Sequence, residues 1–338
     1  MIEKYLEKLQ NKENLTQQEI EDIIHKIMSG NLSKEEMVSF LLKLREKGPT
    51  VDEITGAAKM MRQFVVGIKS KHKILLDTCG TGGDKTNTFN ISTVTALVVA
   101  AAGVAVAKHG NRSVSSRCGS ADVLEALGVN LNLEEKQLTR CLDEIGIAFL
   151  FAQKLHPAMK NVAPVRKELK VETIFNLLGP LTNPANATHQ MVGVYSRELV
   201  EPMAHVLKNL GLKRAMVVHG NDGLDEITTT DKTFISEYNG RDIMTYDIDP
   251  EELKVKRAQP EILKGGDLKE NVRIVHEILD GNPGRKRDIV VVNAAYALYI
   301  AQKVGNIRDG FRLAQESIDK GAAKKKLEDL VKFTKAAK

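Results

Sequence analysis

The stretch Asp77-Thr-Cys-Gly-Thr-Gly-Gly-Asp-Lys-Thr-Asn-Thr-Phe-Asn-Ile-Ser-Thr93 joins a predicted strand to a predicted helix. The apolar run at 74–76 before its glycines predicts a buried strand, and small and β-branched residues at 92–102 predict a helix. A second strand is predicted at 104–107, and strand, crossover helix and strand at this spacing favour a parallel pair. Similar apolar runs, separated by helix-like stretches, predict further strands at 215–218 and 289–292 and extend the α/β pattern.

The glycines of this stretch predict a phosphate-binding loop. They allow backbone amides to approach an anion closely, and the helix start beyond them favours negative charge. The loop is not a Walker A motif, because Asp84 precedes Lys85, and it is not a dinucleotide fingerprint, whose last glycine would fall on Lys85. A tight turn without a ligand is the alternative interpretation. Polar side chains near the helix start favour the binding interpretation: Thr88, Asn90, Ser92 and Thr93.

A second polar cluster, Lys108-His-Gly-Asn-Arg-Ser-Val-Ser-Ser-Arg-Cys-Gly-Ser120, follows the next predicted strand. Strand ends on this side of an open parallel sheet bind ligands. Eight of its thirteen side chains are Lys, Arg, Asn or Ser, which suit phosphate oxygens. We expect Ser120 to cap a helix at 121–127. A flexible polar loop is the alternative.

A third cluster, Asp225-Glu226, follows the predicted strand at 215–218. Adjacent carboxylates in a loop are usually solvated. Beside a phosphate-binding loop they also suit magnesium, which a pyrophosphate holds through its own oxygens and one or two protein carboxylates.

The first 65 or so residues predict a small helical bundle. Three capping boxes begin at Thr16, Ser33 and Thr50, each with a glutamate three residues later and helical apolar spacing beyond it. We therefore expect a helical domain at 1–68, joined by part of 160–190, and an α/β domain at 72–338.

Composition fits an ordinary globular chain of 338 residues with about two domains, 42% hydrophobic and 28% charged residues, and a net charge of +5. This charge suits a phosphorylated substrate but does not establish nucleic-acid binding. The longest nearly apolar run has twelve residues, against about 20 for a membrane span. Three cysteines without a C-x-x-C pair support neither a zinc site nor a disulfide framework. With no signal sequence evident, we expect a cytoplasmic protein with no membrane contact.

Several motifs together resemble those of the anthranilate phosphoribosyltransferase family, in the family's order. They are Gly80-Thr-Gly-Gly-Asp84, Asn90-Ile-Ser-Thr93, Lys108-His-Gly-Asn-Arg-Ser-Val-Ser-Ser116, Gly119-Ser-Ala-Asp-Val-Leu-Glu-Ala-Leu-Gly128, Phe175-Asn-Leu-Leu-Gly-Pro-Leu-Thr-Asn-Pro184 and Gly223-Leu-Asp-Glu226.

The resemblance implies a helical domain and a larger α/β domain with a mainly parallel sheet, of the nucleoside phosphorylase and phosphoribosyltransferase type. It implies a homodimer joined through the helical parts. It further implies that anthranilate and 5-phosphoribosyl 1-pyrophosphate give N-(5-phosphoribosyl)anthranilate and pyrophosphate in tryptophan biosynthesis, with two Mg²⁺ ions.

The resemblance also assigns residues to the substrates. Ser92, Asp225 and Glu226 would hold magnesium, and Gly80, Asn111 and Arg166 would contact anthranilate, with His109 and Pro180 nearby. The residues expected to contact the phosphoribosyl donor are Gly80, Gly83, Asp84, Thr88, Asn90, Ile91, Ser92, Thr93, Lys108, His109, Gly110, Asn111, Arg112, Ser113, Val114, Ser115, Ser116 and Ser120. One position departs from the family, since Glu172 stands where members often have Arg.

Three residues of this set are candidates for catalysis. Lys108 would stabilise the negative charge of the leaving pyrophosphate. His109 would either position the acceptor or take its proton, although the neutral amine of anthranilate needs no strong base. Asp84 would brace the loop by accepting backbone amides, or act through a metal-bound water.

Two rival functions remain open at this point. A pyrimidine nucleoside phosphorylase has a similar fold, but it binds free phosphate and would not need the Asp225-Glu226 pair. A non-catalytic nucleic-acid-binding relative has only scattered lysines in its favour, so we expect no nucleic-acid partner.

Overall fold

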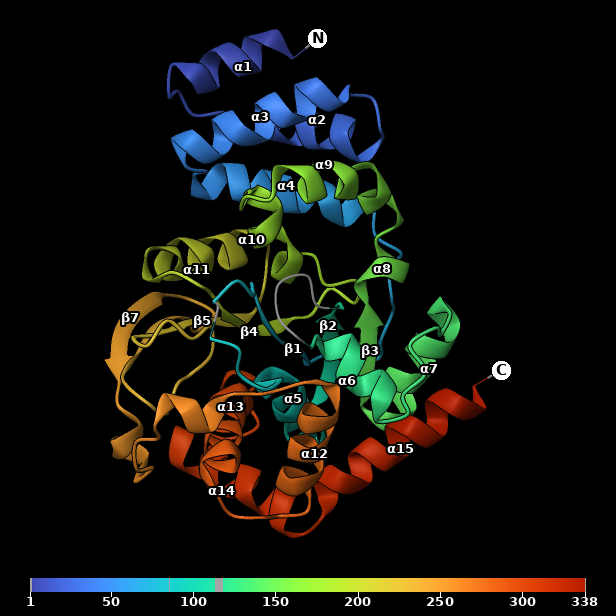
Figure 1. The fold of residues 1–338 in the computed structure, drawn as a ribbon, viewed down its shortest axis with the longest axis vertical. Helices are drawn as coiled ribbons and strands as arrows, with labels where there is room; N and C mark the ends of the chain where they lie inside the picture. Colours follow the sequence, from blue (N-terminus) through green and yellow to red (C-terminus); the bar gives the residue numbers. More distant parts are fainter. Residues whose placement is uncertain (1, 85, 113–117, 338) are drawn as a thin grey trace.

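A seven-stranded sheet forms the centre of the molecule in the computed structural model, which describes residues 2–84, 86–112 and 118–337. The strand order is β3-β2-β1-β4-β5-β6-β7 (Figure 1). The first five strands in this order are parallel, and β6 and β7 continue the sheet in antiparallel fashion. The strands are β1 (Leu75–Gly80), β2 (Ala105–Gly110), β3 (Ile147–Phe151), β4 (His189–Gly193), β5 (Arg214–Gly220), β6 (Thr233–Tyr238) and β7 (Ile243–Ile248). The predicted α/β class with a mainly parallel sheet is confirmed.

Strands β1 and β2 continue two or more residues past their predicted apolar cores. In β1 the extension includes Asp77 and Thr78, which are polar and fully buried. Long-range partners satisfy the Asp77 carboxylate: the Asn183 side chain donates to Oδ2 over 2.8 Å and the His109 backbone N–H donates to Oδ1 over 3.2 Å. The strand therefore carries polar groups into the region of the glycine loop.

The prediction of a strand at 289–292 is wrong. These residues lie within helix α13 (Arg285–Ile300), which packs on α5 (Ile91–Ala101), α14 (Ile307–Asp319) and strand β4. Because neighbours surround this helix, eleven of its residues are buried and its sequence lacks the polar face that marks a surface helix. A four-residue apolar run cannot by itself distinguish such a helix from a buried strand.

Helices cover both faces of the sheet, one group below it and one group above it in Figure 1. Alternate residues of β5 show the division: Met216 and Val218 belong to one apolar core, and Ala215 and Val217 belong to the other. The group below comprises α5, α12 (Leu268–Leu279), α13, α14 and α15 (Ala322–Ala336), with α6 (Ser120–Ala126) and α7 (Glu135–Ile145) beside them. The group above comprises α10 (Ile174–Leu181) and α11 (Val200–Asn209).

The N-terminal helices stack above this second layer (Figure 1). All three predicted capping boxes are present, at Thr16, Ser33 and Thr50. Val162 and Phe175 belong to the same apolar core as the N-terminal helices, so the chain returns to them after β3. The helices of this region are α1 (Glu3–Gln10), α2 (Gln17–Met28), α3 (Lys34–Lys47), α4 (Val51–Gln63) and α9 (Ala163–Leu169), and the short α8 (Ala152–Leu155) leads to them from β3. Short 3₁₀ turns lie at Pro157–Asn161, Arg197–Leu199, Pro250–Leu253 and Pro260–Leu263.

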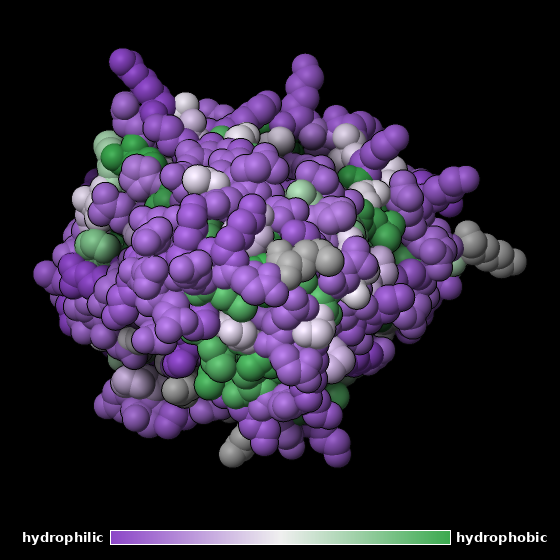
Figure 2. Space-filling view, turned by 90° about the horizontal axis from the view of Figure 1, so that it is seen from above, coloured by the Kyte–Doolittle hydropathy of each residue, from purple (hydrophilic) through white to green (hydrophobic). Residues whose placement is uncertain are grey.

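The surface at the helical end is mostly hydrophilic, interrupted by a few hydrophobic areas (Figure 2). Within residues 2–84, 86–112 and 118–337, no helix has both the length and the apolar character needed to cross a membrane.

Candidate active site

A cavity of about 280 Å³ lies where β1 and β2 end and α5 begins. It brings together the glycine loop, the start of the second polar cluster and the acidic pair, which are far apart in sequence. The predicted site residues that line it are Gly80, Gly83, Asp84, Thr88, Asn90, Ile91, Ser92, Thr93, Lys108, His109, Gly110, Asn111, Ser120, Asp225 and Glu226. The sequence interpretation missed other lining residues, namely Cys79, Gly82, Asn87, Phe89, Cys118 and Gly119. Ser113, Val114, Ser115 and Ser116 lie outside the described residues.

The acidic pair contacts backbone amides of the phosphate-binding loop and of the α5 start. The Gly82 N–H donates to Asp225 Oδ2 over 2.9 Å, and the Ser92 N–H donates to Glu226 Oε1 over 3.1 Å. Burial raises the pKa of both carboxyl groups, and the negative charge of Asp84 raises them further. A cation bound between these carboxylates would offset the free-energy cost of keeping them charged in a buried place.

The donor set of the acidic pair fits magnesium held jointly with a substrate. Asp225, Glu226 and the Ser92 hydroxyl are hard oxygen ligands of the kind that Mg²⁺ prefers. Among the described residues, no group of three or more His, Cys, Asp or Glu side chains could enclose a metal ion alone. A metal here would need oxygens from a bound phosphate or from water to complete its coordination.

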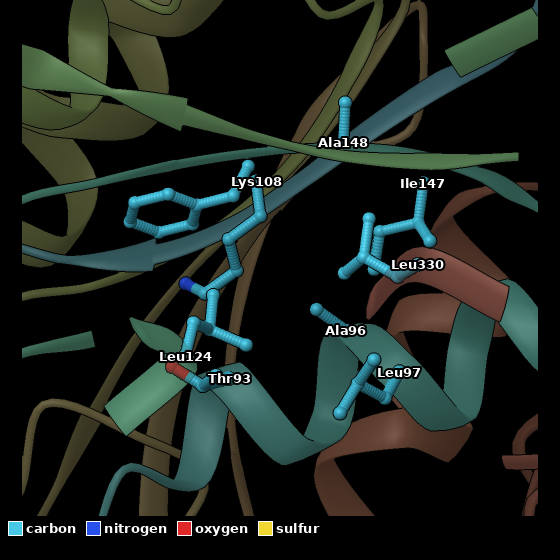
Figure 3. A pocket seen from close by; sticks show the side chains of 9 residues that line it. Thr93, Ala96, Leu97, Lys108, Leu124, Ile147, Ala148 and Leu330 are labelled. Atoms are coloured by element: carbon cyan, nitrogen blue, oxygen red, sulfur yellow. The ribbon is translucent and has the colours of Figure 1, made fainter. Parts of the chain in front are cut away.

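Lys108 lies at the base of the cavity and is almost completely buried. Its ammonium donates to the Thr78 carbonyl and, over 3.2 Å, to the Ser92 hydroxyl. In Figure 3 its side chain extends from the sheet toward Thr93 and Leu124, beside a second, largely apolar cavity of about 10 Å³. Apolar neighbours thus surround the methylene stem, and the charged end reaches polar groups at the active-site cavity.

His109 is paired with His156, a residue that the sequence interpretation did not select. Their Nε2 atoms are 3.1 Å apart, so one imidazole donates and the other accepts. Burial and the neighbouring His156 lower the pKa of His109 to about 3, and burial lowers that of His156 to about 4. Both rings are therefore neutral near pH 7. His156 stands alone in its stretch of sequence, so no local pattern could have identified it.

Two arginines of the predicted site do not line the cavity. Arg112 forms 2.8 Å contacts with the carboxylates of Asp122 and Glu125 on α6, and these hydrogen bonds raise its pKa. Arg166 lies on α9, half-buried, where burial lowers its pKa and its Nη2 donates to Asn176 Oδ1 over 3.4 Å.

The structure corrects the expected helix cap and bears on one of the two roles expected for Asp84. Ser120 is the first residue of α6 rather than its cap, which is Gly119, and the Ser120 hydroxyl donates to the Asn111 carbonyl over 3.3 Å. The Asp84 carboxylate accepts a hydrogen bond from the Thr86 hydroxyl. Among the described residues, no backbone amide donates to the Asp84 side chain, so the expected bracing by amides is not observed.

The cavity cysteines are not activated thiols. Burial raises the pKa of Cys79, and burial raises that of Cys118 to about 11. A nucleophilic cysteine needs a lowered pKa, so the thiols are better explained as packing groups.

Family profiles cover most of the chain. Residues 72–324 match the glycosyl transferase family a/b domain, and residues 3–65 match the helical bundle domain of the glycosyl transferase family. The chain is 52% identical over 334 residues to the anthranilate phosphoribosyltransferase of Acetivibrio thermocellus, covering 99% of this chain and 97% of that one.

Solved structures agree with these matches. The crystal structure of anthranilate phosphoribosyltransferase from Thermus thermophilus superposes with a TM-score of 0.93 at 42% identity, covering 98% of this chain and 99% of that one. The Saccharomyces cerevisiae enzyme in complex with PRPP and Mg has a TM-score of 0.92 at 27% identity, covering 99% and 98% of the two chains. The chain therefore belongs to the anthranilate phosphoribosyltransferase family, and it is a phosphoribosyl-transferring enzyme.

Proposed function

We propose that this member of the family transfers the 5-phosphoribosyl group of 5-phosphoribosyl 1-pyrophosphate to the amine of anthranilate. The products would be N-(5-phosphoribosyl)anthranilate and pyrophosphate, and the step would belong to tryptophan biosynthesis. The observation that carries the proposal is the meeting of a glycine loop, a helix start, a buried lysine and an acidic pair in one cavity. The yeast relative, with a similar fold, is in complex with PRPP and Mg.

The donor would lie against backbone amides of the glycine loop and the start of α5, with Lys108 beneath it. Asp225, Glu226 and Ser92 would hold two Mg²⁺ ions, which supply positive charge next to the pyrophosphate. As the bond at ribose C1 breaks, the Lys108 ammonium and the loop amides stabilise the negative charge on the leaving pyrophosphate. The cavity residues Gly80, Gly83, Thr88 to Thr93, Lys108 to Asn111 and Ser120 would bind the donor, with Arg112 and residues 113–116 completing the contacts.

The acceptor needs less chemistry than the donor. The aromatic amine of anthranilate is already neutral near pH 7, and the pKa of His109 of about 3 makes that imidazole a weak base. His109 would therefore position the acceptor together with Gly80 and Asn111. Arg166 would bind the anthranilate carboxylate, because its 3.4 Å contact with Asn176 is weak compared with a bidentate carboxylate pair.

The rival nucleoside phosphorylase activity has no use for the acidic pair at the phosphate site. The decisive assay follows the loss of anthranilate in the presence of the phosphoribosyl donor, with and without Mg²⁺, beside a control reaction of thymidine with phosphate. Magnesium-dependent loss of anthranilate is the expected result. Release of thymine without turnover of anthranilate would be consistent with the fold but would refute the proposed function.

We further propose a division into two domains and a homodimer. Residues 1–68 and part of 160–190 would form the helical domain, supported by the apolar core shared by α2, α4, α9 and α10. The dimer would form through this helical domain, on whose α3 helix Leu42 is 38% exposed. Light scattering on the purified chain should give twice the monomer mass, and a monomer at micromolar concentration would overturn the dimer.

A further inference from the structure

Asp225 lies in a slot formed by two glycines on neighbouring strands. Gly80 at the end of β1 and Gly193 at the end of β4 are direct partners in the parallel ladder. A Cβ atom at Gly80 would lie 2.2 Å from Asp225 Oδ2, and one at Gly193 would lie 1.5 Å from the Asp225 carbonyl oxygen. The backbone at residue 225 can therefore pass the end of β4 only because Gly193 lacks a side chain, and the Asp225 carboxylate occupies the space that a side chain at residue 80 would need.

Ile227, the residue after the acidic pair, is held by Asn293, a fully buried residue on α13. The Ile227 N–H donates to Asn293 Oδ1 over 3.0 Å, and Asn293 Nδ2 donates to the Ile227 carbonyl over 2.8 Å. A third bond, from Nδ2 to the Ile289 carbonyl over 2.9 Å, fixes the amide to its own helix. The Asn293 side chain thus hydrogen-bonds both the backbone N–H and the backbone carbonyl of Ile227.

We infer that Gly193 and Asn293 are positioning residues that hold the Asp225-Glu226 pair in place for a divalent cation and the pyrophosphate of the donor. This inference rests on the proposed function. The two carboxylates of the pair repel each other and are repelled by Asp84. Because this repulsion tends to push the side chains apart, the backbone that carries them must be held by other groups. The described residues of β4 and α13 contribute nothing to the cavity lining, so both positioning contacts come from the scaffold behind the site.

The contacts of Gly193 and Asn293 with the acidic segment differ in position from the hydrogen bonds that line the cavity. Gly82 and Ser92 donate to the carboxylates from the loop and helix start that would also bind phosphate. Gly193 and Asn293 act on the backbone of residues 225 and 227, and neither of them lines the cavity. Groups that orient metal ligands from outside typically change metal affinity by 10- to 100-fold when they are removed.

The test uses Gly193→Ala and Asn293→Ala in the full-length protein. A methyl group placed on Gly193 would lie 1.5 Å from the Asp225 carbonyl oxygen. Because such a contact needs about 3.0 Å, the backbone of one of the two segments must move by about 1.5 Å. Asn293→Ala leaves both polar groups of Ile227 without their partner. Calorimetric titration with magnesium pyrophosphate gives a readout independent of turnover, and the Mg²⁺ concentration for half-maximal activity gives a second.

Matched controls separate positioning from general loss of stability. Gly305→Ala adds a methyl group in open space, and Glu53→Gln weakens a buried cluster in the N-terminal helices, where Glu53 binds Leu15 N–H and Lys47. We expect both test variants to bind magnesium pyrophosphate at least tenfold more weakly than wild type, while both controls bind as wild type. If one test variant does not melt cooperatively, the other decides the result.

The outcomes distinguish the inference from the function on which it rests. If wild type binds magnesium pyrophosphate, Asp225→Asn abolishes binding, and a folded Gly193→Ala or Asn293→Ala variant keeps wild-type affinity, the inference is overturned and the function stands. If wild type neither binds magnesium pyrophosphate nor consumes anthranilate, the function and the inference fall together.

Discussion

The neutral histidine pair predicts a specific loss of stability in mild acid. In the unfolded chain each imidazole takes up a proton as the pH falls below about 6.5. In the folded protein the pKa of His109 is lowered to about 3 and that of His156 to about 4, so both rings stay mostly neutral at pH 5.0. The unfolded state then binds more protons than the folded state, and stability falls as the pH falls.

The size of the effect follows from the pKa values. Between pH 6.5 and pH 5.0 each histidine removes about 1.4 kcal/mol per pH unit from the free energy of unfolding, because the unfolded state alone gains the proton. The loss is about 2 kcal/mol for each ring and about 4 kcal/mol for the pair. The substitution His156→Gln removes one of these rings and keeps an N–H that can donate to His109. We expect it to reduce the loss on acidification by about 2 kcal/mol.

The assay is urea unfolding at pH 7.5 and pH 5.0 for wild type, His156→Gln and the control His205→Gln, which replaces an exposed histidine on α11. Titration of the carboxyl groups is common to all three proteins and cancels in the comparison. The control should lose as much stability as wild type on acidification. The reasoning is refuted if His156→Gln does so too, or if the His109 imidazole signal titrates near pH 6.5 in an NMR experiment.

Three further predictions concern the substrates and the metal. Arg166→Ala should raise the KM for anthranilate on the order of 100-fold and leave the KM for the phosphoribosyl donor nearly unchanged, since one bidentate charge pair is lost; equal effects in steady-state kinetics would contradict its assignment. Asp225→Asn should lower kcat/KM for the donor at least 100-fold and raise the Mg²⁺ requirement, measured by metal titration; an unchanged requirement would exclude it as a ligand. Asp84→Asn should lower kcat/KM for the donor about tenfold at limiting Mg²⁺ with little change in melting temperature, whereas full activity would remove Asp84 from the metal site.

The parts of the site that could be predicted are those encoded by adjacent residues. The glycine loop, the helix start and the Asp225-Glu226 pair each have their chemistry within a few positions, so their composition and order sufficed. The polar end of β1 could not be predicted in the same way, because the donors that satisfy the buried Asp77 carboxylate are distant in sequence: His109, Asn183 and Gln190 are all more than 30 residues away. His156 was missed for the same reason, since its partner is 47 residues away.

The wrong strand prediction at 289–292 and the failure to identify Asn293 from the sequence have one physical cause. Helix α13 is enclosed by α5, α14 and the sheet, so its sequence lacks the amphipathic pattern that would indicate a helix. A single asparagine within such an apolar run has no local partner, and its partner in the structure, Ile227, is 66 residues away. Residues that orient a site from the scaffold are therefore the ones that local sequence patterns are least able to identify.

The hydrogen bonds of the acidic pair connect the proposed metal ligands to the backbone amides proposed to bind phosphate. The Gly82 and Ser92 N–H groups, which belong to the loop and helix start suited to phosphate, donate to Asp225 and Glu226 in this structure. A phosphate that accepts hydrogen bonds from these two amides would leave the two carboxylates without donors. A bound cation would then compensate the charge of the carboxylates. A cation on the carboxylates likewise frees the amides for phosphate. On the proposed function, each ligand would therefore strengthen the binding of the other by the same factor, as linkage requires, and the site would favour the magnesium complex of the donor over either component alone.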